Sequence, residues 1–294
     1  MWVMSIKNWI TGARVRTLPL AVAPIVLGSA SADLVDRFDP LLALLALLVA
    51  LLLQIGVNYA NDYSDGIRGT DANRVGPLRL TGSGLVRPQA VKFAAALTFG
   101  LAALAGLAIV LLTGQWWLIA VGVLCIIAAW YYTGGKSPYG YAGLGEIAVF
   151  IFFGLIATVG TAYIQILEVD AMAVLLGINF GFYATAVLLV NNIRDVATDR
   201  ESGKNTLSVR IGVKASKWLF GTLLILPAVF NLFLAALYPA TIIGLANLML
   251  VFPAFMAGVR GKTARDYISA LKLTSFAGLG FGLLVGLGLF VVSF

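Results

Sequence analysis

Apolar blocks of about twenty residues, separated by short polar stretches, follow one another along most of this 294-residue chain. A helix of that length spans the hydrocarbon core of a bilayer. A folded water-soluble domain must cover itself with polar groups, and a chain with 61% hydrophobic and 11% charged residues has too few of them. Membrane β-strands would alternate apolar and polar residues instead. The blocks therefore predict an all-α, polytopic membrane protein.

Nine blocks are long enough to cross a bilayer, and we expect them to form one membrane-embedded domain over residues 1–294. They lie near residues 17–33, 40–61, 90–112, 115–133, 143–163, 170–192, 216–237, 239–257 and 269–292. The divisions at Gly114 and Pro239 require tight turns. The chain is then expected to form a single bundle of nine transmembrane helices.

The basic residues indicate how the bundle sits in the membrane. With nine spans, the N-terminal segment and the connections after helices two, four, six and eight share one side. Of the 20 lysines and arginines, all except Arg37 fall on that side. Lysine and arginine concentrate on the cytoplasmic face of membrane proteins. We therefore expect a multi-pass protein of the inner or plasma membrane, with its N-terminus in the cytoplasm and its C-terminus outside.

The start of the chain allows another interpretation, a cleaved signal peptide. Basic residues precede an apolar stretch that runs from Leu18 to Leu27, and small residues follow it. Pro19 and Pro24 interrupt that stretch, and no exported soluble domain follows. A first membrane span is the interpretation that we favour.

Composition excludes several kinds of chemistry. The sequence contains no histidine, so a Ser-His-Asp triad and the usual histidine-containing zinc sites are excluded. The one cysteine, Cys125, cannot form a disulfide within the chain. The net charge of +7 follows from membrane topology, and no soluble basic module indicates nucleic-acid binding.

Two acidic clusters break the apolar pattern at the ends of the second and sixth expected helices. Their sequences are Asn58-Tyr-Ala-Asn61-Asp62-Tyr-Ser-Asp65, followed by Asp71, and Asn191-Asn192-Ile-Arg194-Asp195-Val-Ala-Thr-Asp199. Asn58, Asp62 and Asp65 share one helical face, at i, i+4 and i+7. Asn191, Asp195 and Asp199 share another, at i, i+4 and i+8. Because an even number of helices separates the clusters, both must face the same compartment.

The clusters indicate a divalent cation bound together with a phosphate compound. Stacked carboxylates repel one another and are costly near the membrane, and a hard cation relieves both penalties. Oxygen ligands without histidine or cysteine favour Mg²⁺, which commonly completes its shell with water and substrate phosphates. The alternative is that single residues such as Asp71 and Asp199 act as helix caps or in surface ion pairs.

Basic residues surround both clusters and could neutralise a diphosphate leaving group. They are Arg68, Arg74 and Arg79 after the first cluster, Arg194, Arg200 and Lys204 around the second, and Lys136 between helices four and five. Arginine and lysine beside a carboxylate-bound metal suit that role. Topology alone would also explain many of them, so we expect only part of the set to contact substrate.

At these clusters the sequence resembles the UbiA superfamily of membrane aromatic prenyltransferases. Members have nine transmembrane helices and two aspartate-rich motifs, broadly NDxxDxxxD and DxxxD. Asp195 and Asp199 match the second motif, and Asn61, Asp62 and Asp65 match most of the first. The first motif departs at its last position, which holds a glycine, with an aspartate two residues later.

Shorter runs resemble the branch of that superfamily that acts on 1,4-dihydroxy-2-naphthoate. These runs are Arg14-Val-Arg16-Thr-Leu-Pro19, Asn61 to Asp71 with Arg74-Val-Gly-Pro-Leu-Arg79, Tyr132-Thr-Gly-Gly, and Tyr141-Ala-Gly-Leu-Gly-Glu146. The resemblance covers nearly the whole chain. It implies prenyl transfer from a polyprenyl diphosphate to the naphthoate ring, with loss of CO₂, giving demethylmenaquinone and diphosphate.

The resemblance also implies roles for residues of the two clusters. Asp62, Asp65, Asp195 and Asp199 would be catalytic and hold Mg²⁺, with Asp71 as a further metal ligand and Lys136 as a catalytic cation. The residues implied to bind the substrate diphosphate are Asn58, Asn61, Asn191, Asn192, Arg68, Arg74, Arg79, Lys204 and Arg14. The long apolar tail of the substrate implies a cavity that opens sideways to lipid.

Three alternatives remain open at this point. The acceptor could be another ring, such as 4-hydroxybenzoate or homogentisate. The chain could be a transporter for anions or metal ions, although transport favours polar groups near mid-membrane and interrupted helices. A lipid alcohol phosphotransferase also uses paired aspartates, but concentrates them in one helical region.

Overall fold

The computed structural model describes residues 6–70 and 79–292, and every regular element in that part of the chain is a helix. The elements are α1 (Ile6–Ala13), η1 (Val15–Thr17), α2 (Pro19–Asp33), α3 (Pro40–Ile67), α4 (Pro88–Thr113), α5 (Leu118–Tyr131), η2 (Tyr139–Ala142), α6 (Gly145–Val149), η3 (Phe150–Ile156), α7 (Ala157–Ile166), α8 (Ala171–Glu201), α9 (Leu207–Leu237), η4 (Pro239–Asn247), α10 (Leu248–Arg260) and α11 (Ala264–Val292). The all-α prediction is confirmed.

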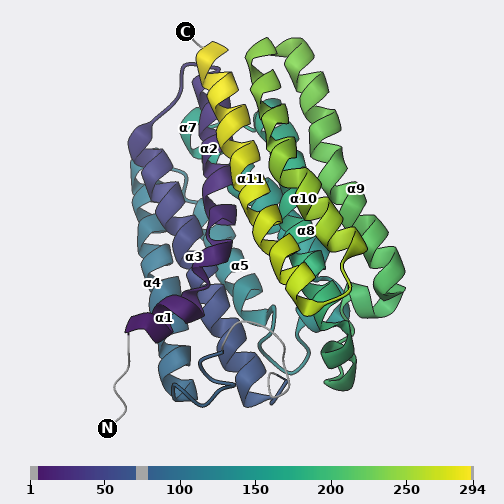
Figure 1. Cartoon of the computed structure of the whole chain (residues 1–294). Coiled ribbons are helices and arrows are strands. Elements are labelled where there is room, and N and C mark those ends of the chain that lie inside the picture. The colour runs from purple at the N-terminus through teal and green to yellow at the C-terminus, as the bar shows by residue number, and fades with distance from the viewer. Residues whose placement is uncertain (1–5, 71–78, 293–294) are drawn as a thin grey trace.

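Most of the helices lie roughly side by side in one bundle, and the short helix α1 crosses one end of it (Figure 1). Seven continuous helical segments of the described chain are long and apolar enough to cross a membrane. An eighth is added if Ile6–Thr17 and Pro19–Asp33, which meet at an angle of 49°, count as one span. The protein is therefore a multi-pass membrane protein with seven or eight candidate spans.

The predicted count of nine differs from this number at one helix. The expected segment 115–133 forms α5, which has only 14 residues and is shorter than a full span. The tryptophans at its start lie in a turn, and the Thr133-Gly-Gly run after it leaves the helix. A ninth crossing remains a prediction.

Two helices extend well beyond the predicted ends of their apolar blocks. The expected segment 40–61 is part of α3, which ends at Ile67, and the expected segment 170–192 is part of α8, which ends at Glu201. Hydropathy marks where a chain leaves the apolar layer, whereas backbone hydrogen bonds can continue into polar sequence. Both acidic clusters therefore lie on continuous helix.

Acidic residues at the opposite end of the bundle cap helices. The carboxylate of Asp39 accepts hydrogen bonds from the backbone N–H groups of Leu41 at 2.8 Å and Leu42 at 3.0 Å, at the start of α3. Asp170 does the same for the N–H of Ala173 at the start of α8. These side chains satisfy backbone donors that a helix N-terminus leaves without partners.

The helix α8 is the most enclosed of the spans. Of its most apolar 18 residues, 72% are buried, compared with 22% for α3. Phe180, Tyr183 and Leu189 of α8 form one hydrophobic core with side chains of α2, α9, α10 and α11. A second core joins α3 and α4 through residues such as Tyr59 and Phe99. The acidic cluster at the end of α8 therefore lies on the helix that is most buried among the described spans.

Small residues allow the closest helix contacts. A Cβ on Gly282 of α11 would lie 2.7 Å from the Cβ of Ala23, so these two helices meet at backbone distance. Gly28 of α2 faces the α7 backbone in the same way, and its missing Cβ would collide with the carbonyl oxygen of Thr158. Such contacts are the usual basis of helix association in membranes.

We expect Gly28→Ala to lower the stability of the purified protein by about 1–3 kcal/mol, because the added methyl group overpacks against backbone that cannot rotate away. Thermal unfolding in detergent would measure the loss. Gly106→Ala is the matched control, since a Cβ there meets nothing within 4 Å. Equal unfolding temperatures for the two variants would contradict this account of the α2–α7 contact.

Candidate active site

A polar cavity of about 110 Å³ lies where α3 and α8 end. Its acidic and amide lining residues are Asn61 and Asp65 from α3 and Asn191, Asn192, Asp195 and Asp199 from α8. Lys204, just after α8, and Arg14 and Arg79 also line it. The two clusters that the sequence places far apart in the chain therefore surround one cavity.

Asp65 is the side chain on which separate segments converge. Its carboxylate accepts a hydrogen bond from the Tyr141 hydroxyl at 2.5 Å and lies 3.2 Å from Nζ of Lys204. The guanidinium of Arg79 lies 3.8 Å away. The Asp65 side chain is 5% exposed, so these interactions form in surroundings that screen charge poorly. Asp65 thereby ties the end of α3 to the α5–α6 connection and to the loop after α8.

Tyr141 is a site residue that the sequence did not assign. Its ring centroid lies 4.6 Å from the Lys204 ammonium and 5.3 Å from the Arg68 guanidinium, as in cation–π contacts. Burial, followed by the charge of Asp65, raises the pKa of the Tyr141 phenol above its usual value of 10. The phenol therefore stays protonated at neutral pH and donates its hydrogen bond. Only its place in the run that ends at Glu146 could have drawn attention to it.

Arg68 binds protein backbone in this structure. Its guanidinium donates hydrogen bonds to the carbonyl oxygens of Thr133 and Gly135, in the connection between α5 and α6. The hydroxyl of Thr133 in turn donates to Asn61 Oδ1 at 2.7 Å. These contacts fix the connection against the end of α3, and so hold Tyr141 beside Asp65.

Asp195 is paired with its neighbour in the chain. Arg194 donates two hydrogen bonds to the Asp195 carboxylate, both at 2.7 Å, and a third to Asn191 Oδ1 at 2.8 Å. The Arg194 side chain is only 2% exposed, so this is a buried bidentate pair. One turn further, Thr206 donates to Asp199 at 3.4 Å.

Asn58 and Asp62 of the first cluster hold neighbouring segments and do not line the cavity. Asn58 donates to the carbonyl oxygen of Ala13, near the start of the chain, at 3.0 Å. The Asp62 carboxylate, 1% exposed, accepts from the N–H groups of Leu80 and Thr81, both at 2.8 Å. Asn61 and Asp65 line the cavity, whereas Asn58 and Asp62, on the same helix, bind backbone of neighbouring segments.

The remaining predicted site residues fall in three places. Lys136 is exposed and lies outside the cavity lining, whereas Lys204 lies within it. Arg14 and Arg79 line the cavity as well. Asp71 and Arg74 lie outside the described residues.

The donor set of the cavity suits a hard cation that shares its ligands with a substrate. The side chains of Asp65, Asp195 and Asp199 present only oxygen, which is the ligand preference of Mg²⁺. Within residues 6–70 and 79–292, no group of three acidic, histidine or cysteine side chains is placed to hold a metal by itself. Mg²⁺ bound by few carboxylates commonly completes its shell with water and substrate phosphates.

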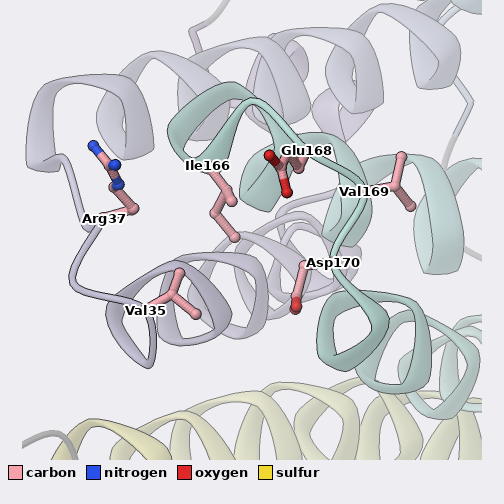
Figure 2. Close-up of a pocket in the computed structure, with 6 residues that line it drawn as sticks. All are labelled: Val35, Arg37, Ile166, Glu168, Val169 and Asp170. Atoms are coloured by element: carbon pink, nitrogen blue, oxygen red, sulfur yellow. The ribbon is translucent and has the colours of Figure 1, made fainter.

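A larger hollow of about 280 Å³ lies at the other end of the bundle (Figure 2). It is lined by Val35 and Arg37 after α2 and by Ile166, Glu168, Val169 and Asp170 between α7 and α8. Arg37 and Glu168 are exposed, and Asp170 is occupied with Ser31 and the α8 cap. The smaller cavity, in which buried ionised groups converge, is therefore the candidate active site.

Comparison with known proteins identifies the family of this chain. The model of the UbiA prenyltransferase family matches residues 21–277. The 1,4-dihydroxy-2-naphthoate octaprenyltransferase of Mycobacterium tuberculosis is 47% identical over 96% of this chain and 96% of its own length. The protein of the same name from Escherichia coli is 46% identical over 77% of each chain. This chain belongs to the UbiA prenyltransferase family.

Solved structures share the fold at low sequence identity. A UbiA homologue from Archaeoglobus fulgidus bound to DMAPP and Mg²⁺ superposes with a TM-score of 0.64 at 13% identity, covering 95% of this chain and 98% of that one. The same homologue bound to GPP and Mg²⁺ gives a TM-score of 0.65. The helical bundle is thus a UbiA-like fold.

We expect Asp62→Asn to lower the stability of the protein by about 1–3 kcal/mol, because an amide can accept from only one of the two buried N–H groups and turns a donor toward the other. Thermal unfolding would measure this effect. Asp36→Asn, on an exposed loop at the other end, is the matched control and should leave stability unchanged. Lost activity with unchanged stability would show that Asp62 acts as a metal ligand and not as an anchor.

Proposed function

We propose that this protein transfers a polyprenyl chain from polyprenyl diphosphate to 1,4-dihydroxy-2-naphthoate, releasing diphosphate and CO₂. The observation that supports this most is the cavity that joins the acidic clusters of α3 and α8 to Lys204, Arg79 and Arg14. The names of the M. tuberculosis and E. coli relatives support the choice of acceptor.

The catalytic work of the site is to stabilise the departing diphosphate. Asp65, Asp195 and Asp199 would hold Mg²⁺, with amide oxygens such as that of Asn61 in support. The bound ion would supply positive charge to the diphosphate oxygens as the allylic C–O bond breaks. Lys204 and Arg79, now 3.2 and 3.8 Å from Asp65, lie where they can turn to the same oxygens.

The acceptor ring then attacks the allylic carbocation through the carbon that bears its carboxylate. The new C–C bond forms, the neighbouring hydroxyl becomes a carbonyl, and its proton leaves. Loss of CO₂ returns an electron pair to the ring, which regains a proton on oxygen. The product is the hydroquinone form of demethylmenaquinone, and no external oxidant or reductant is needed.

The membrane supplies the environment for both the tail and the chemistry. A polyprenyl tail is apolar, and the apolar outer faces of the bundle carry exposed residues such as Phe93, Leu97 and Leu104 on α4. The substrate can therefore approach from the lipid while its diphosphate enters the polar cavity at the end of α3 and α8. One membrane-embedded domain over residues 1–294 carries out the whole reaction in this proposal.

In this proposal the chain crosses the membrane nine times, and the active site faces the cytoplasm. The seven continuous spans, the bent pair Ile6–Thr17 and Pro19–Asp33, and the short helix α5 together give nine. This count places every lysine and arginine except Arg37 on one side, which is the cytoplasmic side by their distribution. The cavity and the N-terminus then face the cytoplasm, and the C-terminus lies outside.

We expect purified protein in liposomes to form prenylated naphthohydroquinone and CO₂ from the two substrates when Mg²⁺ is present. EDTA, Asp65→Ala and Asp195→Ala should each reduce the rate by about a hundredfold or more, because the leaving group loses its main electrostatic stabilisation. Product extraction with measurement of released CO₂ would report the rate.

The outcomes separate the levels of the proposal. Turnover only with another ring, such as 4-hydroxybenzoate, would keep prenyl transfer and overturn the acceptor. Absence of transfer to any aromatic acceptor by folded protein would overturn the enzyme.

We expect α5 to cross the membrane, so that Trp116 lies outside and Ser137 lies in the cytoplasm. In a Cys125→Ser background, a membrane-impermeant maleimide should label Trp116→Cys in intact spheroplasts and Ser137→Cys only in inverted vesicles. Both positions are exposed in the structure, and Cys125 is the sole native cysteine. Labelling of both positions from one side would reduce the count to eight.

A further inference from the structure

Glu146 is a buried acidic residue that the steps above leave without a role. It lies in the first turn of α6, at the start of a membrane span, and is only 4% exposed. One carboxylate oxygen, Oε2, is buried with no hydrogen-bond partner. An unpaired acceptor on a buried acidic side chain is costly, so its retention here calls for an explanation.

The other carboxylate oxygen fixes the orientation of Asn192. Nδ2 of Asn192 donates to Glu146 Oε1 at 2.9 Å. The amide nitrogen of Asn192 therefore faces Glu146, and its carbonyl oxygen lies on the other arm of the planar amide. Asn192 also lines the cavity. Asn192 thus belongs to the cavity wall, and Glu146, which does not line the cavity itself, lies directly behind it.

Asn192, which the resemblance implies as a diphosphate ligand, lies deeper than the aspartates proposed to hold the metal. Asn192 precedes Asp195 by three residues of α8, which is about 4.5 Å along the helix axis toward the membrane. Leu188, an apolar lining residue, lies about one turn deeper still. The neighbouring Gly145 packs against the same wall, since a Cβ there would lie 3.0 Å from Tyr132 Oη and 3.2 Å from Leu188.

We infer that Glu146 and Asn192 form the subsite that binds a phenolic hydroxyl of the aromatic acceptor. The inference rests on the proposed function. The diphosphate offers hydrogen-bond acceptors, and the prenyl tail has no polar group. The ring hydroxyl is therefore the substrate group that can donate a hydrogen bond to these oxygens. The subsite therefore holds the ring between the leaving group and the apolar part of the cavity.

Glu146→Gln tests the subsite while preserving side-chain shape. The KM for dihydroxynaphthoate should rise roughly five- to tenfold, because a glutamine that still accepts from Asn192 places an N–H donor where Glu146 has its second acceptor oxygen. The KM for polyprenyl diphosphate and the Mg²⁺ concentration at half-maximal rate should stay within about twofold, since those groups bind nearer Asp195. Glu168→Gln makes the same substitution at an exposed position on the other end of the bundle and is the matched control. It should leave both KM values and the Mg²⁺ concentration at half-maximal rate unchanged.

A second measurement isolates the hydroxyl itself and can be made on the unaltered protein. Wild-type enzyme should be inhibited by 4-hydroxy-2-naphthoate, whose hydroxyl cannot reach its own carboxylate, at lower concentration than by 2-naphthoate, again by roughly five- to tenfold or more. That preference should largely disappear in Glu146→Gln. Because the wild-type comparison needs no variant, the test stands even where the substitution prevents folding.

Each result has a distinct meaning. Three results would overturn the subsite and leave prenyl transfer intact. They are equal inhibition of the wild type by the two naphthoates, a preference between them that persists in Glu146→Gln, and a parallel rise in the KM values for both substrates. A wild-type protein that binds prenyl diphosphate with Mg²⁺ but alkylates no aromatic acceptor would overturn the proposed function and the subsite with it.

Discussion

The pairing of Asp65 with Lys204 is the contact on which the arrangement of the site depends. An ionised carboxylate that is 5% exposed at the end of a membrane span requires compensating charge, and Lys204 provides it from the loop after the most enclosed helix. Tyr141 donates to the same carboxylate from the α5–α6 connection. One buried charge therefore draws three distant segments into a single cavity.

These compensating contacts are also what a charged substrate can exchange for its own. When a diphosphate binds with Mg²⁺, its oxygens can replace Asp65 as partners of Lys204 and Arg79, and the metal can replace these cations beside the carboxylates. Every charged side chain then has a partner of opposite charge both before and after binding. Asp195 is held by Arg194 in the same manner. The site can thus remain folded without its ligand and still become a strong stabiliser of the leaving group.

Much of this architecture followed from apolar runs and helical spacing. The runs located the continuous spans, and the positions of Asp65, Asp195 and Asp199 indicated two acidic helix faces on the same membrane side. Apolar blocks and helices differ in length at two places: α8 continues nine residues past the end of its apolar block, to Glu201, and α5, with 14 residues, is shorter than the segment expected there.

The sequence alone determined the class of protein and the residues that carry charge into the membrane, because bilayer thickness and the cost of buried charge act on local sequence. Tertiary structure alone decided which of those residues share the cavity. Asp62 and Asp65 have the same chemistry and lie three positions apart, yet one anchors backbone and the other pairs with Lys204. The hydrogen bond from Asn192 to Glu146 likewise depends on how α6 packs against α8, and no spacing in the sequence encodes it.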